Sequence, residues 1–368
     1  MFGLFEDDVA PRQEADRAAF TGVLVVVGAL LLAAAPGPAQ ARDVAGHGDP
    51  PRVHVIATGG TIAYTPDGSL TGEALVAALP GLERVARVSV EEFLNVGSSQ
   101  ITPDHWLRLS LRIQDIYRQQ PDLAGVVVTH GTDTLEETAL FLHLTVADAR
   151  PVVVTGAMRP AQAAGADGPA NLMNAVRLAA DTTARDRPVL VLMNDRIHAA
   201  PGVQKAHTTR VDAFVSVWPG VLGVTDPDLV SWQLPAAPGP LRGAFPVMQE
   251  TRLPRVDIVY AYAGADGSAV RAAADAGARG VVVATVGRGN MPAAQREAVN
   301  AFATGGGAAV LASRTQAGRV PVDPSGGIMG AGDLSPQQAR VLLILALTTT
   351  TDLGEAARLF QAIRGPES

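Results

Sequence analysis

Two polar residues at one junction have side chains suited to catalysis or ligand binding. Thr132 and Asp133 follow an apolar β-branched run, residues 126–128, and stand directly before a helical pattern. Ligands of open α/β sheets bind beyond the carboxyl ends of the strands, and a helix N-terminus offers free N–H groups to anions. Thr132 and Asp133 are therefore candidate site residues. The alternative is that one of them only caps the helix.

Lys205 is the only lysine of the chain, and all the other residues among the 29 Lys+Arg are arginine. A lysine amine can lose its proton when buried, whereas a guanidinium stays charged. An amine that shares a proton with a nearby hydroxyl can act as a general base. With Thr132 and Asp133 it would make a triad of hydroxyl, acid and amine. The alternative is a surface lysine without a role.

A second hydroxyl, Thr61, follows a glycine turn at the end of an expected strand, residues 53–57. Gly59 and Gly60 allow the backbone to adopt a positive φ or to approach a ligand closely. Residues 64–69 contain proline, aspartate and glycine, which predicts a mobile loop. Thr61 is thus a further candidate beside a turn.

The composition argues against several classes of function. The net charge is −7 and no basic stripe is present, so nucleic acid is not an expected partner. The absence of cysteine excludes disulfides, thiolate metal sites and a cysteine nucleophile. The 7 histidines are scattered without ligand spacing, and residues 287–290 lack the lysine of a phosphate-binding glycine motif. We expect no metal and no cofactor.

The N-terminal segment is typical of a protein that leaves the cytoplasm. An apolar run, residues 23–35, precedes a stretch ending in a small-x-small site, which predicts a secretory signal cleaved after Ala41. At about 13 residues the run is too short for an ordinary membrane span. Acidic residues outnumber Arg12 and Arg17 before it. That leaves two alternatives open, a start further downstream or an uncleaved anchor, and we expect a periplasmic or secreted protein.

Strand and helix patterns alternate along the rest of the chain, which favours parallel sheets with helices on both faces. The expected strands are 53–57, a segment ending within 93–97, 126–128, 151–155, 189–193, 256–260, 280–284 and 308–311. The expected helices are 71–79, 104–119, 169–181, 268–276, 292–303 and 335–348. Residues 194–210 are expected to form a polar loop that carries Lys205.

A turn-rich stretch divides this pattern in two. The expected organisation is a signal peptide or anchor at 1–41, an N-terminal domain with the catalytic residues at 42–238, a linker at 239–254 and a C-terminal α/β domain at 255–368. A chain of 368 residues is long enough for about two domains.

Several other polar residues receive structural interpretations. His130 is expected to be a hydrogen-bonding partner at a strand end. Glu136 and Glu137 suit the first turn of a helix, where the dipole favours anions. Arg159 and Asp167 are expected to pair and to shape the loop between them.

Two motifs resemble the signatures of bacterial-type L-asparaginases. They are TGGTIA at residues 58–63 and VTHGTDTLEET at residues 128–138. The resemblance continues through GAMRP and ADGP, MND and SPQQAR at residues 156–160, 166–169, 193–195 and 335–340, and so covers nearly all of the mature chain. Both signatures in order, followed by the matching loop, are strongly specific. The exported type II enzymes are the most similar group.

The resemblance implies an amidohydrolase that converts L-asparagine to L-aspartate and ammonia. Thr61 would be the nucleophile that attacks the side-chain amide carbon and forms an acyl-enzyme. Thr132, Asp133 and Lys205 would form the supporting proton-transfer set. Backbone N–H groups near Thr132 would stabilise the oxyanion. Whether glutamine is also a substrate stays open.

The resemblance also implies how the substrate is held. Ser98 and Asp133 would bind its α-carboxylate and α-amino groups, and Ser99 would replace Ser98 if the alignment shifts by one residue. The expected substrate-binding residues are Gly60, Ser98, Ser99, Thr132 and Asp133. Tyr64 is the only tyrosine in the loop after the first motif. Whether Tyr64 takes the part of the family's activating tyrosine is open.

The family fold implied is a larger N-terminal doubly wound α/β domain and a smaller C-terminal α/β domain, assembled into homotetramers of intimate dimers. Where some members supply an asparagine from the neighbouring subunit, residues 263–265 read Ala-Gly-Ala.

Two rivals remain. A periplasmic amino-acid-binding protein without catalysis would have two similar lobes, although it has no use for a lone proton-sharing amine. The amidase subunit of a tRNA-dependent amidotransferase would work in the cytoplasm and carry an extra N-terminal domain.

Overall fold

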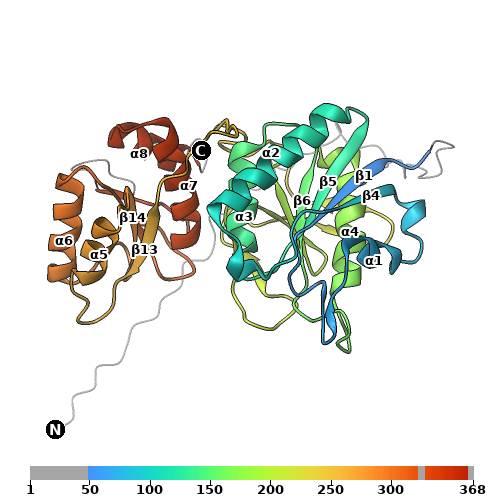
Figure 1. Cartoon of the computed structure of the whole chain (residues 1–368), viewed down its shortest axis with the longest axis horizontal. Coiled ribbons are helices and arrows are strands. Elements are labelled where there is room, and N and C mark those ends of the chain that lie inside the picture. Colours follow the sequence, from blue (N-terminus) through green and yellow to red (C-terminus); the bar gives the residue numbers. More distant parts are fainter. Residues whose placement is uncertain (1–48, 322–327, 364–368) are drawn as a thin grey trace, which may run out of the picture. The chain divides into compact units, whose positions relative to one another are not determined.

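The computed structural model describes residues 49–321 and 328–363 of the 368-residue chain (Figure 1). The segment expected to direct export, residues 1–41, lies outside the described residues. The described residues from Pro50 onward form one compact unit. No helix in these two ranges is long and apolar enough to cross a membrane.

The larger sheet has eight strands in the order β12-β11-β8-β7-β6-β5-β1-β4. The strands are β1 (Arg52–Ala57), β4 (Arg87–Glu92), β5 (Leu123–Thr129), β6 (Val152–Thr155), β7 (Leu190–Met193), β8 (Arg196–Ala199), β11 (Val221–Thr225) and β12 (Val230–Trp232). The five strands from β7 to β4 are parallel, whereas β8, β11 and β12 pair antiparallel. The expectation of a parallel sheet is therefore wrong at one edge, and the sheet is mixed.

The change of direction has a local cause. Asn194 and Asp195 join β7 to β8 with φ values of 49° and 63°. A two-residue turn with both φ values positive is the turn that joins antiparallel strands, and asparagine and aspartate tolerate it. The expectation of a polar loop at 194–210 is accordingly wrong, because β8 and β9 (Val203–Lys205) lie within it.

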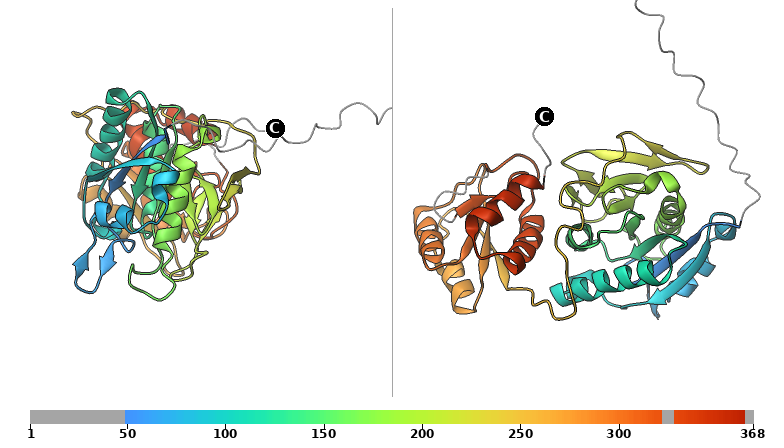
Figure 2. Two further views of the ribbon diagram at one scale, coloured as in Figure 1. Left: turned by 90° about the vertical axis from the view of Figure 1, so that its right-hand side faces the viewer. Right: turned by 90° about the horizontal axis from the view of Figure 1, so that it is seen from above.

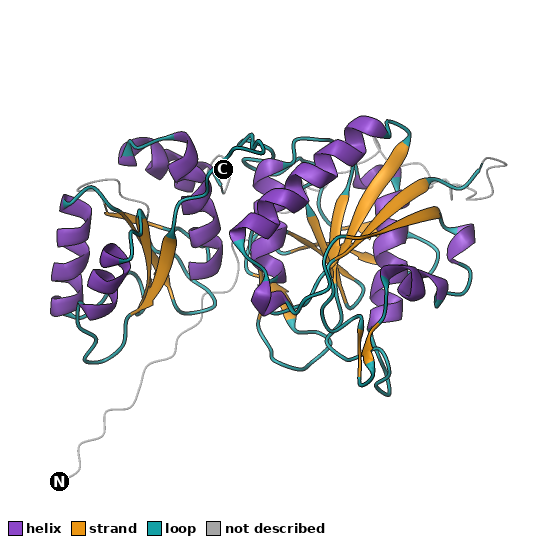
Figure 3. Ribbon diagram, in the orientation of Figure 1, coloured by secondary structure: helices purple, strands orange, loops and turns teal. Residues whose placement is uncertain are grey.

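Helices cover both faces of the larger sheet, as Figures 2 and 3 show. They are α1 (Gly72–Ala77), α2 (Pro103–Gln119), α3 (Leu135–Thr145) and α4 (Gly168–Ala180). Along β5, Val126 and Val128 pack in the core with α2 and α3, while Val127 packs in the core with α4. Side chains of a strand alternate between the two faces of the sheet, and a sheet covered on both faces needs an apolar residue at each position. This agrees with the expected doubly wound domain.

The smaller C-terminal domain has a parallel sheet in the order β13-β14-β15-β16. Its elements are β13 (Val256–Tyr260), α5 (Ser268–Asp275), β14 (Gly280–Thr285), α6 (Ala293–Thr304), β15 (Ala308–Ser313), β16 (Ile328–Gly330), α7 (Pro336–Thr349) and α8 (Leu353–Ala362). β16 and α8 were not expected from the sequence. The predicted fold class, a larger and a smaller α/β domain, is confirmed.

The short elements near the candidate site differ from expectation. Residues 64–69, expected as a mobile loop, form a hairpin of β2 (Tyr64–Thr65) and β3 (Gly68–Ser69). β4 ends at Glu92, so the expected strand end within 93–97 is wrong. Single 3-10 turns occupy Leu82–Arg84, Ser98–Gln100 and Thr182–Ala184, and β9 pairs with β10 (Phe214–Ser216).

Helix α7 joins the C-terminal domain to the segment that precedes Lys205. Gln338 is fully buried, and its side-chain amide donates to the carbonyl oxygens of Ala200 and Val203 at 3.0 and 3.1 Å. It also accepts a bond from the N–H of Gly202 at 3.2 Å. One side chain of α7 thus satisfies three backbone groups of the chain around β8 and β9.

Candidate functional site

The lone lysine lies between the two candidate residues of the central strand–helix junction. Its Nζ is 2.8 Å from Thr132 Oγ1 and 2.6 Å from Asp133 Oδ1. Only 15% of the Lys205 side chain is exposed, and Thr132 is buried. The alternative of an isolated surface lysine is therefore wrong. Hydroxyl, carboxylate and amine converge from positions far apart in the sequence.

Thr132 and Asp133 lie between β5 and α3 and do not cap the helix. The N-cap residue of α3 is Thr134, and no side chain caps this helix by a hydrogen bond. The capping alternative is therefore wrong. Instead, the Thr132 hydroxyl and the Asp133 carboxylate each accept a hydrogen bond from the Lys205 amine.

Lys205 is fixed by its backbone as well as by its side chain. It ends strand β9, where it pairs with Phe214 of β10. Its N–H donates to Glu136 Oε2 at 2.6 Å. The sequence predicted only that Glu136 lies in the first turn of a helix, where the dipole favours anions. It did not predict this contact with Lys205. Glu136 does lie in the first turn of α3, as expected.

A cavity of about 270 Å³ opens beside this cluster. It is lined by Gly60, Thr61, Tyr64, Ser69, Asn95, Val96, Gly97, Ser98, Ser99, Gly131, Thr132 and Asp133. The cavity brings the expected nucleophile and every expected substrate-binding residue together. Its size is below that of pockets for drug-sized ligands, which suits a small amino acid. Ser69 and Asn95, hydrogen-bonded to each other at 2.9 Å, were not singled out from the sequence.

Lys205 lines a second cavity, of about 480 Å³, which Asp133 also lines. Glu136 and Glu137 line that cavity too. The carboxylate of Asp133 borders both spaces. The Lys205 amine is therefore connected to the smaller cavity by its hydrogen bonds with Thr132 and Asp133, which line that cavity.

The two motif loops meet backbone to backbone, and glycine makes this possible. Gly60 has a φ of 87°, and a Cβ there would lie 2.4 Å from the backbone of Gly131. A Cβ on Gly131 would in turn lie 2.8 Å from Ser98 Oγ. No larger side chain fits such distances, so these glycines bring Thr61, Ser98 and Thr132 to one cavity.

Ser98 is held against the same junction. Its Oγ accepts the N–H of Asp133 at 3.2 Å, and its carbonyl oxygen accepts the Thr134 hydroxyl at 2.8 Å. Ser98 is buried, whereas the neighbouring Ser99 is exposed. Both line the cavity, but only Ser98 is fixed by Asp133.

Thr61 and Tyr64 form one edge of the cavity. The N–H of Tyr64 donates to the carbonyl oxygen of Thr61 at 3.2 Å, in the turn that leads into β2. The Tyr64 side chain is 55% exposed. Tyr64 and Thr61 both line the cavity, so the exposed ring borders the space beside the expected nucleophile.

His130 has the structural role that the sequence predicts. Its Nδ1 lies 2.7 Å from the carbonyl oxygen of Gly131, and its Nε2 lies 2.9 Å from Thr138 Oγ1. Burial lowers the pKa of His130 to about 4, so the ring is neutral near pH 7. A carbonyl only accepts, hence Nδ1 carries the proton. Both nitrogens of the ring are thereby occupied within the fold.

The loop after β6 is shaped differently from the prediction. Among the described residues no ion pair joins Arg159 and Asp167. Instead Asp167 accepts the N–H groups of Met158 and Arg159, each at 2.9 Å, and the Arg159 guanidinium donates to Gly165 O at 2.7 Å. The expected pairing is wrong because the Asp167 carboxylate accepts backbone N–H groups and not the Arg159 guanidinium.

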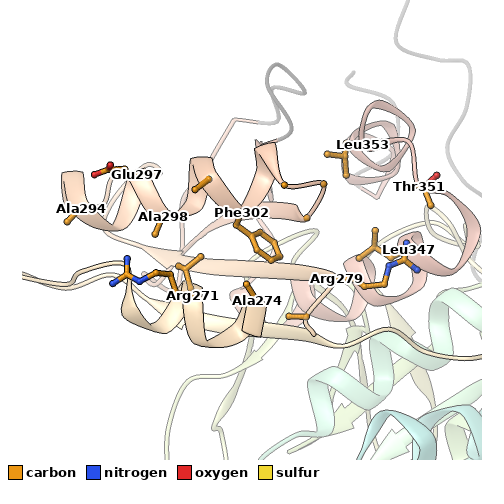
Figure 4. A pocket seen from close by; sticks show the side chains of 16 residues that line it. Arg271, Ala274, Arg279, Ala294, Glu297, Ala298, Phe302, Leu347, Thr351 and Leu353 are labelled. Carbon is orange, nitrogen blue, oxygen red and sulfur yellow. The ribbon is translucent and has the colours of Figure 1, made fainter. Parts of the chain in front are cut away.

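A larger cavity, of about 780 Å³, lies in the C-terminal domain beside α5 and α6. Figure 4 shows Arg271, Arg279 and Phe302 among its lining side chains. The described residues that line it include no lysine or histidine that could take a proton from a nucleophile. It is therefore not the candidate site.

The fold and the cluster of hydroxyl, carboxylate and amine are those of an α/β protein equipped for nucleophilic catalysis. The model of the family "Asparaginase, N-terminal" matches residues 52–237, and that of "Glutaminase/Asparaginase C-terminal domain" matches residues 255–360. The chain belongs to the asparaginase family.

Known relatives agree with this assignment. The chain is 40% identical to L-asparaginase 2 of Escherichia coli, covering 84% of this chain and 92% of the relative. It is 39% identical to a probable periplasmic L-asparaginase of Haemophilus influenzae, covering 84% and 92%. The crystal structure of a probable cytoplasmic L-asparaginase from Campylobacter jejuni matches with a TM-score of 0.80 at 39% identity, covering 85% of this chain and 99% of that one.

Proposed function

We propose that this protein hydrolyses L-asparagine to L-aspartate and ammonia. The observation that carries the proposal is the single amine of Lys205, held by Thr132 and Asp133 beside a cavity that Thr61 also lines. The family assignment supports the same reaction. A non-catalytic binding protein would not need this cluster, and the family assignment gives the amidotransferase subunit no support.

Thr61 is the proposed nucleophile. Its oxygen attacks the side-chain amide carbon, the C–N bond breaks, and the nitrogen leaves as ammonia after taking up a proton. Water then attacks the resulting ester, which releases aspartate and restores the hydroxyl. Splitting the reaction at a covalent intermediate replaces one difficult step by two easier ones.

Thr132, Asp133 and Lys205 are the proposed proton-transfer set. The Lys205 amine lies within hydrogen-bond distance of the Thr132 hydroxyl, which permits proton transfer between them. Asp133 fixes the amine from the other side. Backbone N–H groups near Thr132 are the proposed oxyanion donors.

The proposed substrate contacts follow from the lining of the smaller cavity. Ser98 donates to the α-carboxylate and Asp133 accepts the α-amino group, while Gly60 and Thr132 border the amide. Ser99 and Tyr64 are exposed residues that line the same cavity, and Tyr64 is the proposed residue that helps to activate Thr61. A carboxylate partner for the ammonium group gives specificity for an α-amino acid.

The decisive experiment compares ammonia release from asparagine and glutamine by the full chain and by its Thr61→Ala variant. We expect release from asparagine that the substitution abolishes, and an acyl-enzyme adduct on Thr61 in rapidly quenched samples. Glutamine is the second substrate to measure, since one matching family model covers glutaminases as well. An asparagine rate no higher than that of Thr61→Ala would refute the proposal.

We further propose export through residues 1–41 and assembly into homotetramers, with domains at 42–238 and 255–368 joined by 239–254. A periplasmic relative supports export, and the separate sheets of the two regions support the domain boundaries. Fractionation of expressing cells and light scattering of the purified protein test the first two. Cytoplasmic accumulation of uncleaved chain, or a stable monomer, would contradict them.

A further inference from the structure

Glu136 is a buried carboxyl group that the proposed mechanism does not use. It lies in the first turn of α3, and only 8% of the residue is exposed. Its Oε2 accepts the backbone N–H of Lys205 at 2.6 Å. A polar group in such a place is costly unless it has a partner. The contact therefore ties the end of β9 to the start of α3.

Lys205 forms hydrogen bonds through both its backbone and its side chain with residues at or just before the start of α3. Glu136 holds its backbone, while Thr132 and Asp133, just before α3, hold its amine. Lys205 is the last residue of the short strand β9, Val203–Lys205. Besides the pairing of Lys205 with Phe214 of β10, the bond from its N–H to Glu136 fixes this strand end.

We propose that Glu136 is a positioning residue for the hydrolysis, because it fixes the backbone of Lys205 and so holds the amine between Thr132 and Asp133. The kinetic consequence rests on the proposed function. The anchoring contact itself does not, and it can be tested without an assay of activity.

The surroundings give this anchor a sensitivity to pH. The charged or titratable groups around Glu136 come from three elements and from one cavity wall. They are Lys205 of β9, Glu137 of α3, Arg340 of α7, which lies 3.6 Å from Glu137, and Asp133 and His207 in the wall of the second cavity. Burial raises the pKa of Glu136 to about 7, against the opposing effect of the Lys205 N–H bond. Loss of the proton strengthens the acceptor, since hydrogen bonds to an ionised group are shorter and stronger.

The first test removes the acceptor while a matched variant keeps it. We expect Glu136→Ala to lower kcat by about tenfold or more, with a smaller change in KM, because a misplaced group costs chemistry more than binding. Glu136→Gln keeps a carbonyl oxygen for the Lys205 N–H and should stay within about threefold of wild type at pH 8. Glu137→Gln, the adjacent acid, is the control and should leave kcat unchanged. Wild-type kcat in Glu136→Ala would overturn the inference.

The second test uses the fact that the chain has one lysine. Full-length protein labelled only with ¹⁵N-lysine gives one backbone amide signal, that of Lys205. We expect this signal to shift with pH around a midpoint near 7 in wild type, and to lose that titration in Glu136→Gln. A midpoint kept in the variant, or absent in wild type, would overturn the inference. A wild-type protein that releases no ammonia would instead refute the proposed function, and the amide signal would still decide on the anchor.

Discussion

At the scale of single residues, the site depends on an amine that two oxygen acceptors share. Lys205 meets Thr132 Oγ1 and Asp133 Oδ1 at hydrogen-bond distance with little exposure to water. An arginine could satisfy the same carboxylate, but it could not take a proton from the hydroxyl. The composition, which uses arginine everywhere else, is consistent with this difference.

Lys205→Arg is the sharpest test of that difference. The substitution keeps a positive charge beside Asp133 but removes the group that can exchange a proton with Thr132. We expect kcat for asparagine to fall by about 100-fold or more. The thermal midpoint should change by only a few degrees, which serves as the folding control. Activity within about threefold of wild type would show that the amine only supplies charge.

Glu136→Gln should change how stability depends on pH. The pKa of Glu136 is raised by burial from its usual 4.5 to about 7, so the folded protein binds the proton more tightly than the unfolded chain. The stabilisation by the neutral form is complete below pH 4.5 and is lost as the pH rises through 7. Denaturant titrations at pH 5 and pH 8 should show wild type losing up to about 3 kcal/mol more than the variant. Parallel pH curves would contradict this.

The sequence predicted the members of the site better than their contacts. Thr132, Asp133 and Lys205 could be selected because motif position and the scarcity of lysine are visible in a sequence. The contact of Glu136 with the Lys205 backbone could not be foreseen, because it depends on where β9 lies relative to α3. Glu136 and Glu137 are neighbours in sequence, yet one accepts from β9 and the other faces α7.

At the scale of elements, the site is made by three turns that follow parallel strands. The turns after β1, β4 and β5 supply Thr61, Ser98 and Thr132. Carboxyl ends of adjacent parallel strands lie at one edge of a sheet, so the topology brings these turns together. Glycine at the points of closest approach then lets them touch.

Gly60→Ala should damage both the fold and the activity. The new Cβ would lie 2.4 Å from the Gly131 backbone, at a φ of 87°. Gly220→Ala is a matched control, because its φ is 99° but no atom lies within 4 Å of a Cβ there. We expect Gly220→Ala to lose about 1 kcal/mol of unfolding free energy from backbone strain alone. Gly60→Ala should lose at least about 2 kcal/mol more and most of its kcat. Equal losses in the two variants would contradict the close approach of the loops.

The secondary-structure prediction was wrong where the chain changes direction after β7. β5 was recognised because an apolar β-branched run forms a strand buried on both faces, and β1 was recognised from the alternation of its residues. β8 was missed since Arg196 and His198 alternate with apolar residues on a short antiparallel strand, and that pattern also looks like a polar loop. Helix α8 was missed although Leu353, Ala356, Ala357 and Phe360 repeat at helical spacing.

At the scale of the whole molecule, the C-terminal domain supports the segment that carries the lysine. Gln338 of α7 bonds three backbone groups around β8 and β9. Arg340 of the same helix lies 3.6 Å from Glu137 of α3. Through Gln338, the smaller domain therefore supports the chain around β9 without supplying a proposed catalytic group.

Gln338→Ala should expose this dependence. It leaves Gly202 N–H and the carbonyls of Ala200 and Val203 without their side-chain partner in a buried place. We expect a loss of about 2–4 kcal/mol of unfolding free energy and a fall in kcat. Gln337→Ala, the adjacent and less buried position, should cost no more than about 0.5 kcal/mol. Similar small losses in both variants would show that α7 does not support β9.

The solitary lysine also has a consequence for handling the protein. Reagents that attach polymers, dyes or solid supports to primary amines find one side chain of that type in the whole chain, besides the terminal amino group. Ordinary proteins spread such modification over many surface lysines, but here it would fall on the residue that joins Thr132 to Asp133. Conjugation through carboxylates, or through an introduced thiol in a chain that has none, would leave this amine intact.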